Sequence, residues 1–226
     1  MDKTRLRVRF TKTGDLRWIS HRDLARVWER LLRRANLQLA FSQGFHPKPR
    51  ISFPSALALG IEALDEIVEL EIVGEFSLQQ IEADLRREMP IGMELIELSS
   101  LTLGLGKAKV IGASYRVQIT AEERDEIAGR LEELLCSDVI EIARDGKTVS
   151  CDPQDPNFEL RIEGQDEDRS DRGTLCPYSL VFSLPADAGG SVRPSEMLDC
   201  VGLPDLLAQG GTLQRTRVHL SEPIKD

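Results

Sequence analysis

The sequence predicts an α+β fold built from two tandem lobes, each with the order strand, helix, strand, strand, helix, strand. Three features predict it: alternating apolar segments typical of strands, two capped amphipathic segments within the first hundred residues, and a similar pattern beyond residue 113. This is the ferredoxin-like (βαββαβ) order, with antiparallel sheets covered by helices on one face. The predicted domains are a lobe at 1–100, a linker at 101–112 and a second lobe at 113–226.

The first predicted strand, Arg5–Thr11, alternates basic and apolar residues. Because successive side chains of a strand point to opposite faces, Leu6, Val8 and Phe10 would be buried. The opposite face would then carry three arginines: Arg5, Arg7 and Arg9.

A helix is expected to begin after Ser20, because Ser20 and Asp23 have the spacing of a capping box. Its apolar residues recur with helical spacing, as required of a helix that packs on a sheet: Leu24, Val27, Trp28, Leu31, Leu32 and Ala35. Four arginines would fall within about 80° of each other on its outer face. They are Arg22, Arg26, Arg30 and Arg33.

The rest of the first lobe follows the same order. Leu37 to Phe53 is expected to be a short strand followed by an extended loop fixed by Pro47 and Pro49. A helix capped by Ser77 would end at Pro90. The remaining strands are predicted at Ile51–Leu59, Glu66–Val73 and Met93–Leu98.

In the second lobe, helices are predicted at Ala121–Leu135 and Pro194–Val201, the latter with proline in its first turn. An acid-rich loop at 164–173 would be an insertion between strands. The predicted strands are Tyr115–Thr120, Val139–Ala143, Phe158–Ile162, Tyr178–Leu184 and Arg215–Leu220.

The N-terminal fifth of the chain is basic although the whole chain is acidic. Residues 1–50 hold 13 Lys and Arg against four Asp and Glu, a charge of +9, and the remainder holds 16 against 34, a charge of −18. A pI of about 5.0 excludes a chain that coats nucleic acid with its whole surface. The asymmetry indicates a face for a polyanion or an acidic partner.

No apolar run approaches the roughly 20 residues that a bilayer-spanning helix needs, and the first ten residues carry charges where a signal peptide is apolar. We therefore expect a cytoplasmic protein without membrane contact. The cysteine spacings fit neither zinc nor iron–sulfur sites, so we expect reduced, mostly packed thiols, no metal and no cofactor. The cysteines are Cys136, Cys151, Cys176 and Cys200.

The N-terminal cluster of basic and aromatic residues is the candidate binding site. Arginine forks suit phosphate, lysine supplies a point charge, and exposed aromatic rings stack on unpaired bases. The candidate nucleic-acid-binding residues are Arg17, Trp18, Arg22, Arg26, Arg30, Arg33, Phe45, Lys48 and Arg50. The alternative is a solvated helix face above a core that contains Trp18, Trp28, Phe41 and Phe45.

Catalysis has weaker support in the sequence. His21 and His46 lie in the same cluster with Asp23 near, and an imidazole beside a carboxylate can perform acid–base chemistry. Both histidines also occupy common structural positions, and His219 is expected to be an ordinary strand residue. Because no phosphate-binding loop, GxSxG or HExxH motif occurs, we expect no catalytic activity of the chain on its own.

Residues 7–70 resemble the radical-SAM-linked proteins, a bacterial family of uncharacterised function found fused to or encoded beside radical SAM proteins. The resemblance rests on a Ser-His-x-Asp-Leu helix start, on a Gly-Phe-x-Pro-x-Pro loop, and more thinly on RPSEML at 193–198 and QRTRVHL at 214–220. The matching motif residues are Ser20, His21, Asp23, Ser42, Gly44, Phe45, Pro47, Pro49, Arg193, Pro194 and Arg215. Residues 152–156 depart from the basic stretch expected there.

This resemblance implies a separately encoded radical SAM enzyme as partner, and points toward RNA. The leading hypothesis is a non-catalytic accessory protein whose basic lobe binds structured RNA, such as tRNA or rRNA. One alternative is a protein-interaction module that docks the radical SAM partner without RNA. Another, by analogy of architecture with CRISPR repeat-processing nucleases, is a metal-independent endoribonuclease.

Overall fold

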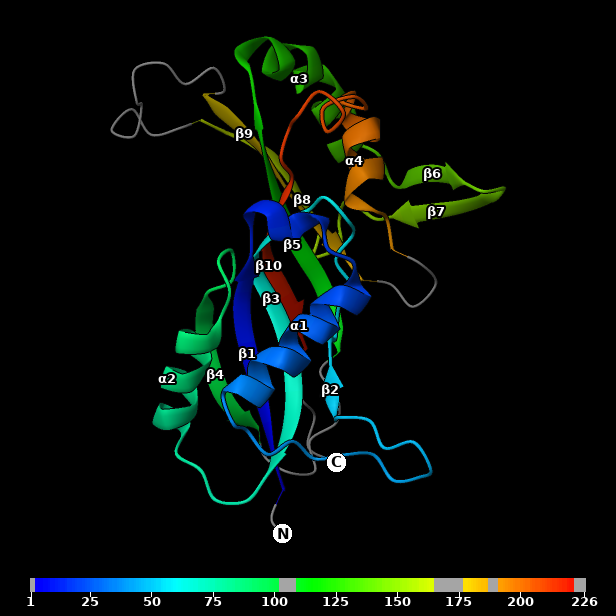
Figure 1. The fold of residues 1–226 in the computed structure, drawn as a ribbon. Coiled ribbons are helices and arrows are strands. Elements are labelled where there is room, and N and C mark those ends of the chain that lie inside the picture. Colours follow the sequence, from blue (N-terminus) through cyan, green and yellow to red (C-terminus); the bar gives the residue numbers. More distant parts are fainter. Residues whose placement is uncertain (1–2, 102–108, 165–176, 187–190, 222–226) are drawn as a thin grey trace. The chain divides into compact units, whose positions relative to one another are not determined.

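The structure is a computed structural model that describes residues 3–101, 109–164, 177–186 and 191–221. Within these ranges it is a mixed α+β fold with antiparallel strand pairs and four α-helices, which confirms the α+β class that the sequence predicts (Figure 1). The chain divides into two compact units: Met1–Lys109 with Leu220–Asp226, and Val110–His219. Most of the predicted linker, residues 165–173 of the predicted acidic loop and Cys176 lie outside the described residues.

The first unit places its strands in the order β4-β1-β3, with β2 also paired to β3, and all these pairs are antiparallel. The strands are β1 (Lys3–Lys12), β2 (Ile51–Ser52), β3 (Glu62–Val73) and β4 (Leu95–Leu101). The helices are the 3-10 helix η1 (Gly14–Trp18), α1 (His21–Arg34) and α2 (Leu78–Glu88).

Both α-helices of this unit pack on one face of its sheet, and Figure 1 shows α1 (blue) lying across β1 and β3. Leu6, Val8 and Phe10 are buried as predicted. The buried Trp28 of α1 meets Phe10 edge to face, with ring centroids 4.9 Å apart. The predicted apolar stripe of α1 is confirmed: Leu24, Trp28, Leu31, Leu32 and Ala35 are buried, with Val27 half-buried.

The N-terminus of α1 is fixed by Ser20. The Ser20 hydroxyl accepts the Asp23 backbone N–H at 3.2 Å and donates to the Asp23 carboxylate at 2.7 Å. Side-chain capping of this kind satisfies a backbone donor that has no partner inside the helix. The arginines on the outer face of α1 therefore stand on a helix held at its start by this cap and along its length by the core.

One strand prediction in the first unit is wrong. Only Ile51–Ser52 of the predicted strand Ile51–Leu59 is extended and paired. Pro54 follows directly, and proline has no backbone N–H to donate to a neighbouring strand. The next strand, β3, begins at Glu62, four residues before the predicted start.

The second unit has the strand order β10-β5-β9-β8 and a separate hairpin. Its strands are β5 (Val110–Ile119), β6 (Ile140–Arg144), β7 (Lys147–Cys151), β8 (Glu159–Gly164), β9 (Tyr178–Pro185) and β10 (Gln214–Leu220). Its helices are α3 (Ala121–Leu135) and α4 (Pro194–Val201), with the predicted bounds.

The segment predicted as a strand at Val139–Ala143 pairs with β7, which the sequence did not predict. The β6–β7 turn is made by Asp145 and Gly146, whose φ angles of 49° and 76° suit a tight hairpin turn. No helix in the described ranges is long and apolar enough to cross a bilayer.

Candidate functional site

The outer face of α1 carries the four arginines that the sequence placed there, and all are exposed: Arg22, Arg26, Arg30 and Arg33. Arg26 pairs with Asp23 at 3.1 Å, in an ion pair whose two side chains are about half exposed. The other three form no salt bridge with any residue that the structure describes. We call these four residues the α1 arginine face.

The β1 arginines have a different environment. Arg7 pairs with Glu69 at 2.7 Å, and Arg5 pairs with the same carboxylate. Arg9 pairs with Asp65. Glu69 is only 2% exposed at its side chain, so these charges are neutralised within the sheet. The second basic surface suggested by the alternation of β1 is therefore occupied by partners from β3.

Most other arginines of the first unit also have acidic partners. The pairs are Arg17 with Glu62, Arg34 with Glu88, Arg50 with Glu71, Arg86 with Glu82, and Arg87 with Asp84 and Glu88. Arginines without an acidic partner are thus concentrated on α1 within the described part of this unit.

Residues 41–50, called the 41–50 loop, form a loop between α1 and β2 that is closed by its own hydrogen bonds. The Ser42 backbone N–H donates to the Lys48 carbonyl at 2.9 Å, and the Lys48 N–H donates to Ser42 Oγ at 3.0 Å. Gly44 has a φ of +127°, which L side chains rarely adopt. Phe45 beside it is fully exposed, so the motif residues Ser42, Gly44, Pro47 and Pro49 shape a loop that presents an aromatic ring and Lys48 to solvent.

Trp18 at the end of η1 is 58% exposed. The Arg17 guanidinium lies 5.2 Å from the centre of its ring, at cation–π distance. Gly60 lies against the same ring, because a Cβ added there would come within 3.0 Å of it. Trp18 is therefore exposed, as a stacking role requires, but it already has two neighbours.

A groove of about 600 Å³ begins at the last turns of α1, and we call it the Arg33 groove. Leu37, Leu39 and Val73 are half-buried in its lining, and Phe41 and Pro49 of the 41–50 loop also line it. Glu29, Arg33 and Gln38 supply its polar groups. The groove thus links the α1 arginine face to the 41–50 loop, and Phe41, weighed in the sequence as a core residue, is half exposed in it.

The two candidate catalytic histidines have separate surroundings. His21 is exposed at the first position of α1 and meets Phe53 edge to face, with ring centroids 5.1 Å apart. His46 is exposed in the 41–50 loop. The hydrogen bond from Ser20, helped by Arg26, holds the pKa of Asp23 below its usual value. The contacts of Asp23 with Ser20 and Arg26 therefore belong to helix capping and the α1 arginine face.

Two of the three second-unit motif residues, Arg193 and Pro194, lie at the start of α4, and the third, Arg215, lies on β10. Pro194 is its first residue, and the Arg193 backbone N–H donates to the Glu196 carboxylate at 2.8 Å. Glu196 also binds Arg144, and that hydrogen bond is the main reason that its pKa is lowered. Arg215 is only 1% exposed, so it lies inside the unit and not on a solvent-facing anion site.

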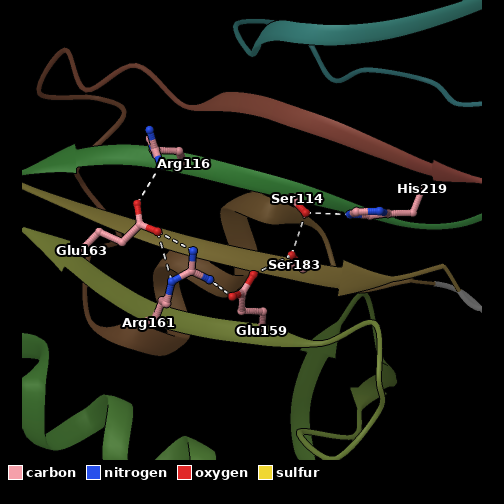
Figure 2. A network of polar contacts seen from close by, with 7 residues as sticks. All are labelled: Ser114, Arg116, Glu159, Arg161, Glu163, Ser183 and His219. Carbon is pink, nitrogen blue, oxygen red and sulfur yellow. Dashed lines mark hydrogen bonds and ion pairs between the residues drawn. The ribbon is translucent and has the colours of Figure 1, made fainter.

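A row of polar side chains crosses four strands of the second unit (Figure 2). Ser114 Oγ lies 2.7 Å from His219 Nε2 and 2.7 Å from Ser183 Oγ, and Ser183 donates to Glu159 at 3.4 Å. The row borders a hollow of about 420 Å³. Arg161 bridges Glu159 to Glu163, so the row's carboxylates and hydroxyls are bound to one another (Figure 2).

Sequence reasoning missed this row, because its residues lie on four segments and only the strand register brings them together. Ser114 stands opposite Ser183, and Ser183 stands opposite Glu159. In the described ranges, no group of three or more His, Cys, Asp or Glu could hold a metal ion. The three cysteines that the structure describes are free thiols. Cys136 is exposed, Cys200 is half-buried, and burial raises the pKa of Cys151 to about 11.

Residues 5–194 match the model of a protein family described as "Uncharacterized protein conserved in bacteria (DUF2344)". No curated protein matches the chain. The description of this family mentions neither RNA nor a radical SAM protein.

Three solved structures have low overall similarity to the chain. An unknown protein from Galdieria sulphuraria has 7% identity and a TM-score of 0.29, covering 98% of this chain and 100% of its own. The small subunit of acetolactate synthase from Thermotoga maritima has 9% identity and a TM-score of 0.29, with 99% and 100% covered. A putative glycine cleavage system transcriptional repressor has 9% identity and a TM-score of 0.26, with 100% of both chains covered.

Proposed function

Because the chain belongs to DUF2344, a family of uncharacterised bacterial proteins, we propose its function from its own surface: the first unit binds structured RNA through the α1 arginine face. One observation carries the proposal. Arg22, Arg30 and Arg33 are exposed and form no salt bridge in the described residues, whereas most arginines of the same unit are ion-paired. Guanidinium groups without an internal counter-charge are the ones available to an external anion.

The spacing of these arginines suits a phosphate backbone. Arg22 and Arg33 lie eleven residues apart on a helix that rises 1.5 Å per residue, so the α1 arginine face is roughly 16 Å long. That length can follow several phosphates of one strand. The core beneath α1 fixes the backbone of the row, so little backbone conformational entropy is lost when RNA binds.

Exposed aromatic rings favour RNA over an acidic protein surface as the ligand. Trp18, Phe41 and Phe45 are 58%, 50% and 102% exposed, and all belong to segments next to α1. Unpaired bases stack on exposed rings of this kind. Structured RNA presents both phosphates and unpaired loop bases, so it matches both features.

The proposal includes a protein partner. The resemblance of residues 7–70 to radical-SAM-linked proteins supports a separately encoded radical SAM enzyme that acts on the bound RNA. The four cysteines of this chain are 15 or more residues apart, so the partner would have to supply the closely spaced cysteines of a cluster. Co-purification of both proteins with RNA, and loss of the complex after nuclease treatment, would support an association of the two proteins through RNA. A complex that survives nuclease treatment would favour direct protein docking.

The proposal also covers architecture and location. We propose that both units are ferredoxin-like lobes. Apart from the β6–β7 hairpin inserted after α3, the second unit has the element order β5, α3, β8, β9, α4, β10, which matches β1, α1, β2, β3, α2, β4 of the first. The two strand orders, β4-β1-β3-β2 and β10-β5-β9-β8, agree with this equivalence. A cytoplasmic location is proposed as the compartment of tRNA and rRNA.

A matched pair of variants tests RNA binding. The test variant is Arg22→Ala with Arg30→Ala and Arg33→Ala, and the control is Arg34→Ala with Arg86→Ala and Arg87→Ala. Both remove three exposed positive charges from the first unit, but the control arginines are ion-paired. Fluorescence anisotropy with labelled bulk tRNA should show an affinity loss of about tenfold or more for the test variant and within about twofold for the control. If both triple variants lost the same affinity, the effect would come from net charge alone, and the proposal would be contradicted.

A further inference from the structure

We propose that the Arg33 groove holds one unpaired nucleotide, with its base against Phe41 and its phosphate on Arg33. This inference rests on the proposed function. It adds a preference for an unpaired nucleotide, which the α1 arginine face alone does not select. Phosphate contacts position a nucleic acid, whereas contacts to a base distinguish unpaired from paired segments.

The groove has the size and lining for a nucleotide. Its volume of about 600 Å³ lies in the range of small-molecule sites. Leu37 and Leu39 in its lining are half-buried and pack on the core of the first unit. An apolar lining of this kind excludes water from the flat faces of a base but offers nothing to a phosphate.

The backbone around the groove is anchored on both sides. The Val73 N–H donates to the Gln38 carbonyl at 2.9 Å, and the Ala40 N–H donates to the Glu71 carbonyl at 2.8 Å. Phe41 itself pairs with Pro49 across the base of the 41–50 loop. The ring is thus carried by a segment hydrogen-bonded to β3, which lowers the entropy lost when a base stacks on it.

Phe41 is a better stacking platform than the aromatic residues proposed from the sequence. Trp18 already lies against Gly60 and the Arg17 guanidinium, and Phe45 is fully exposed at the loop tip. Phe41 is half exposed and lines the groove together with Arg33. A base between Phe41 and the apolar lining would be covered more completely than one on Phe45.

The polar groups at the groove determine how the nucleotide would be oriented. Arg33 supplies positive charge, Gln38 supplies an amide, and Glu29 supplies a carboxylate that would repel a phosphate placed beside it. The phosphate is therefore assigned to Arg33, and Glu29 to the amino edge of the base, from which a carboxylate accepts hydrogen bonds.

The test compares a single-stranded 12-nucleotide RNA with a 12-base-pair duplex, both labelled, for the full chain and its variants. Phe41→Leu should weaken single-strand binding about tenfold, the order expected for one stacked base, and change duplex binding less than about twofold. Phe41→Tyr keeps the ring and should bind like the unsubstituted chain. Phe76→Leu is the matched control, because Phe76 is an exposed phenylalanine of the same unit outside the groove.

The outcomes separate this inference from the function on which it rests. If Phe41→Leu binds both RNAs like the unsubstituted chain while the three α1 arginine substitutions weaken them, the groove assignment fails and RNA binding stands. If neither set of substitutions changes binding, both fail. The groove assignment would also fail if Phe41→Leu weakened the binding of single strand and duplex equally. It would fail as well if polyglutamate of equal charge displaced the labelled single strand as effectively as unlabelled single strand does. An unchanged tryptophan fluorescence unfolding midpoint excludes misfolding as the cause of a loss.

Discussion

The arginines of β1 and those of α1 come from the same 50-residue stretch and recur with equal regularity, yet their environments are opposite. Arg5, Arg7 and Arg9 lie at side-chain exposures of 15%, 17% and 12% against nearly buried carboxylates of β3. Three of the four residues of the α1 arginine face have no such partner in the described residues, and all four are exposed. Periodicity therefore predicts the face to which a charge points, but only the tertiary fold determines whether that charge is available.

The comparison shows that only part of the +9 charge of residues 1–50 is available to a ligand. The ion pairs on β1 belong to the internal electrostatics of the sheet, where removing one partner leaves an uncompensated charge in a poorly solvated place. On α1 the same residue type contributes little to folding and remains available for a ligand.

The largest effect is expected from Glu69→Gln. This substitution removes the carboxylate that Arg5 and Arg7 share, where Glu69 is 2% exposed. Loss of one member of a buried ion pair costs about 3–5 kcal/mol, so the free energy of unfolding of the first unit should fall by that order. Tryptophan fluorescence in urea measures it selectively, because both tryptophans of the chain, Trp18 and Trp28, belong to the first unit.

Glu29→Gln is the control for this experiment. Glu29 is exposed on α1, and substitutions at such positions usually change stability by less than about 0.5 kcal/mol. A loss below about 1 kcal/mol for Glu69→Gln would mean that the β1 arginines do not need their partner, and the contrast with α1 would disappear.

A smaller loss is expected from Glu196→Gln in the second unit. Glu196 binds Arg144 and the Arg193 backbone N–H, and its side chain is 14% exposed. Hydrogen bonds to charged groups contribute about 1.5–3 kcal/mol, so about 2 kcal/mol should be lost. Far-UV circular dichroism follows the unfolding, and the tryptophan transition of the first unit should keep its midpoint.

The pH dependence gives this prediction a sign. The pKa of Glu196 is lowered in the folded protein, chiefly by the Arg144 hydrogen bond. Its stabilisation is therefore present above the unfolded pKa of about 4.3 and is lost as the pH falls through the lower folded value. The stability difference between Glu196→Gln and the unsubstituted chain should shrink below about pH 4. A difference that stays constant down to pH 2 would contradict the role given to the carboxylate.

The sequence predicts best where the determinants are local. The start of α3 follows from Thr120 and Glu123, which cap the helix reciprocally, and the start of α4 from Pro194 in its first turn. The exposed face of α1 follows from its apolar stripe in the same way. These signals span only a few residues, so no tertiary information is needed to recognise them.

The sequence fails where residues distant along the chain determine the environment. The partner of Arg7, Glu69, lies 62 residues away, and Ser114 and His219 meet across 105 residues. The exposure of Phe41 likewise depends on Pro49 and on the end of β3. Strand register creates these contacts, and no spacing within one segment encodes them.

The smallest effect on stability is expected from the α1 arginine face. Arg30→Ala with Arg33→Ala should change the free energy of unfolding by less than about 0.5 kcal/mol, because both side chains are exposed and alanine favours helices. Urea unfolding followed by tryptophan fluorescence measures this change. A loss above about 2 kcal/mol would mean that these arginines support the fold and are not held available for a ligand.

The salt dependence of RNA binding tests most directly whether the unpaired arginines of α1 contact phosphates. The binding constant for bulk tRNA is measured between 50 and 200 mM salt for the unsubstituted chain and for the two triple variants. Each lost phosphate contact lowers the log–log slope by about 0.7–0.9, so replacing Arg22, Arg30 and Arg33 by alanine should lower it by about 2–3. Replacing the ion-paired Arg34, Arg86 and Arg87 should leave the slope unchanged. Equal slopes for all three proteins, or equal reductions in both variants, would contradict the account.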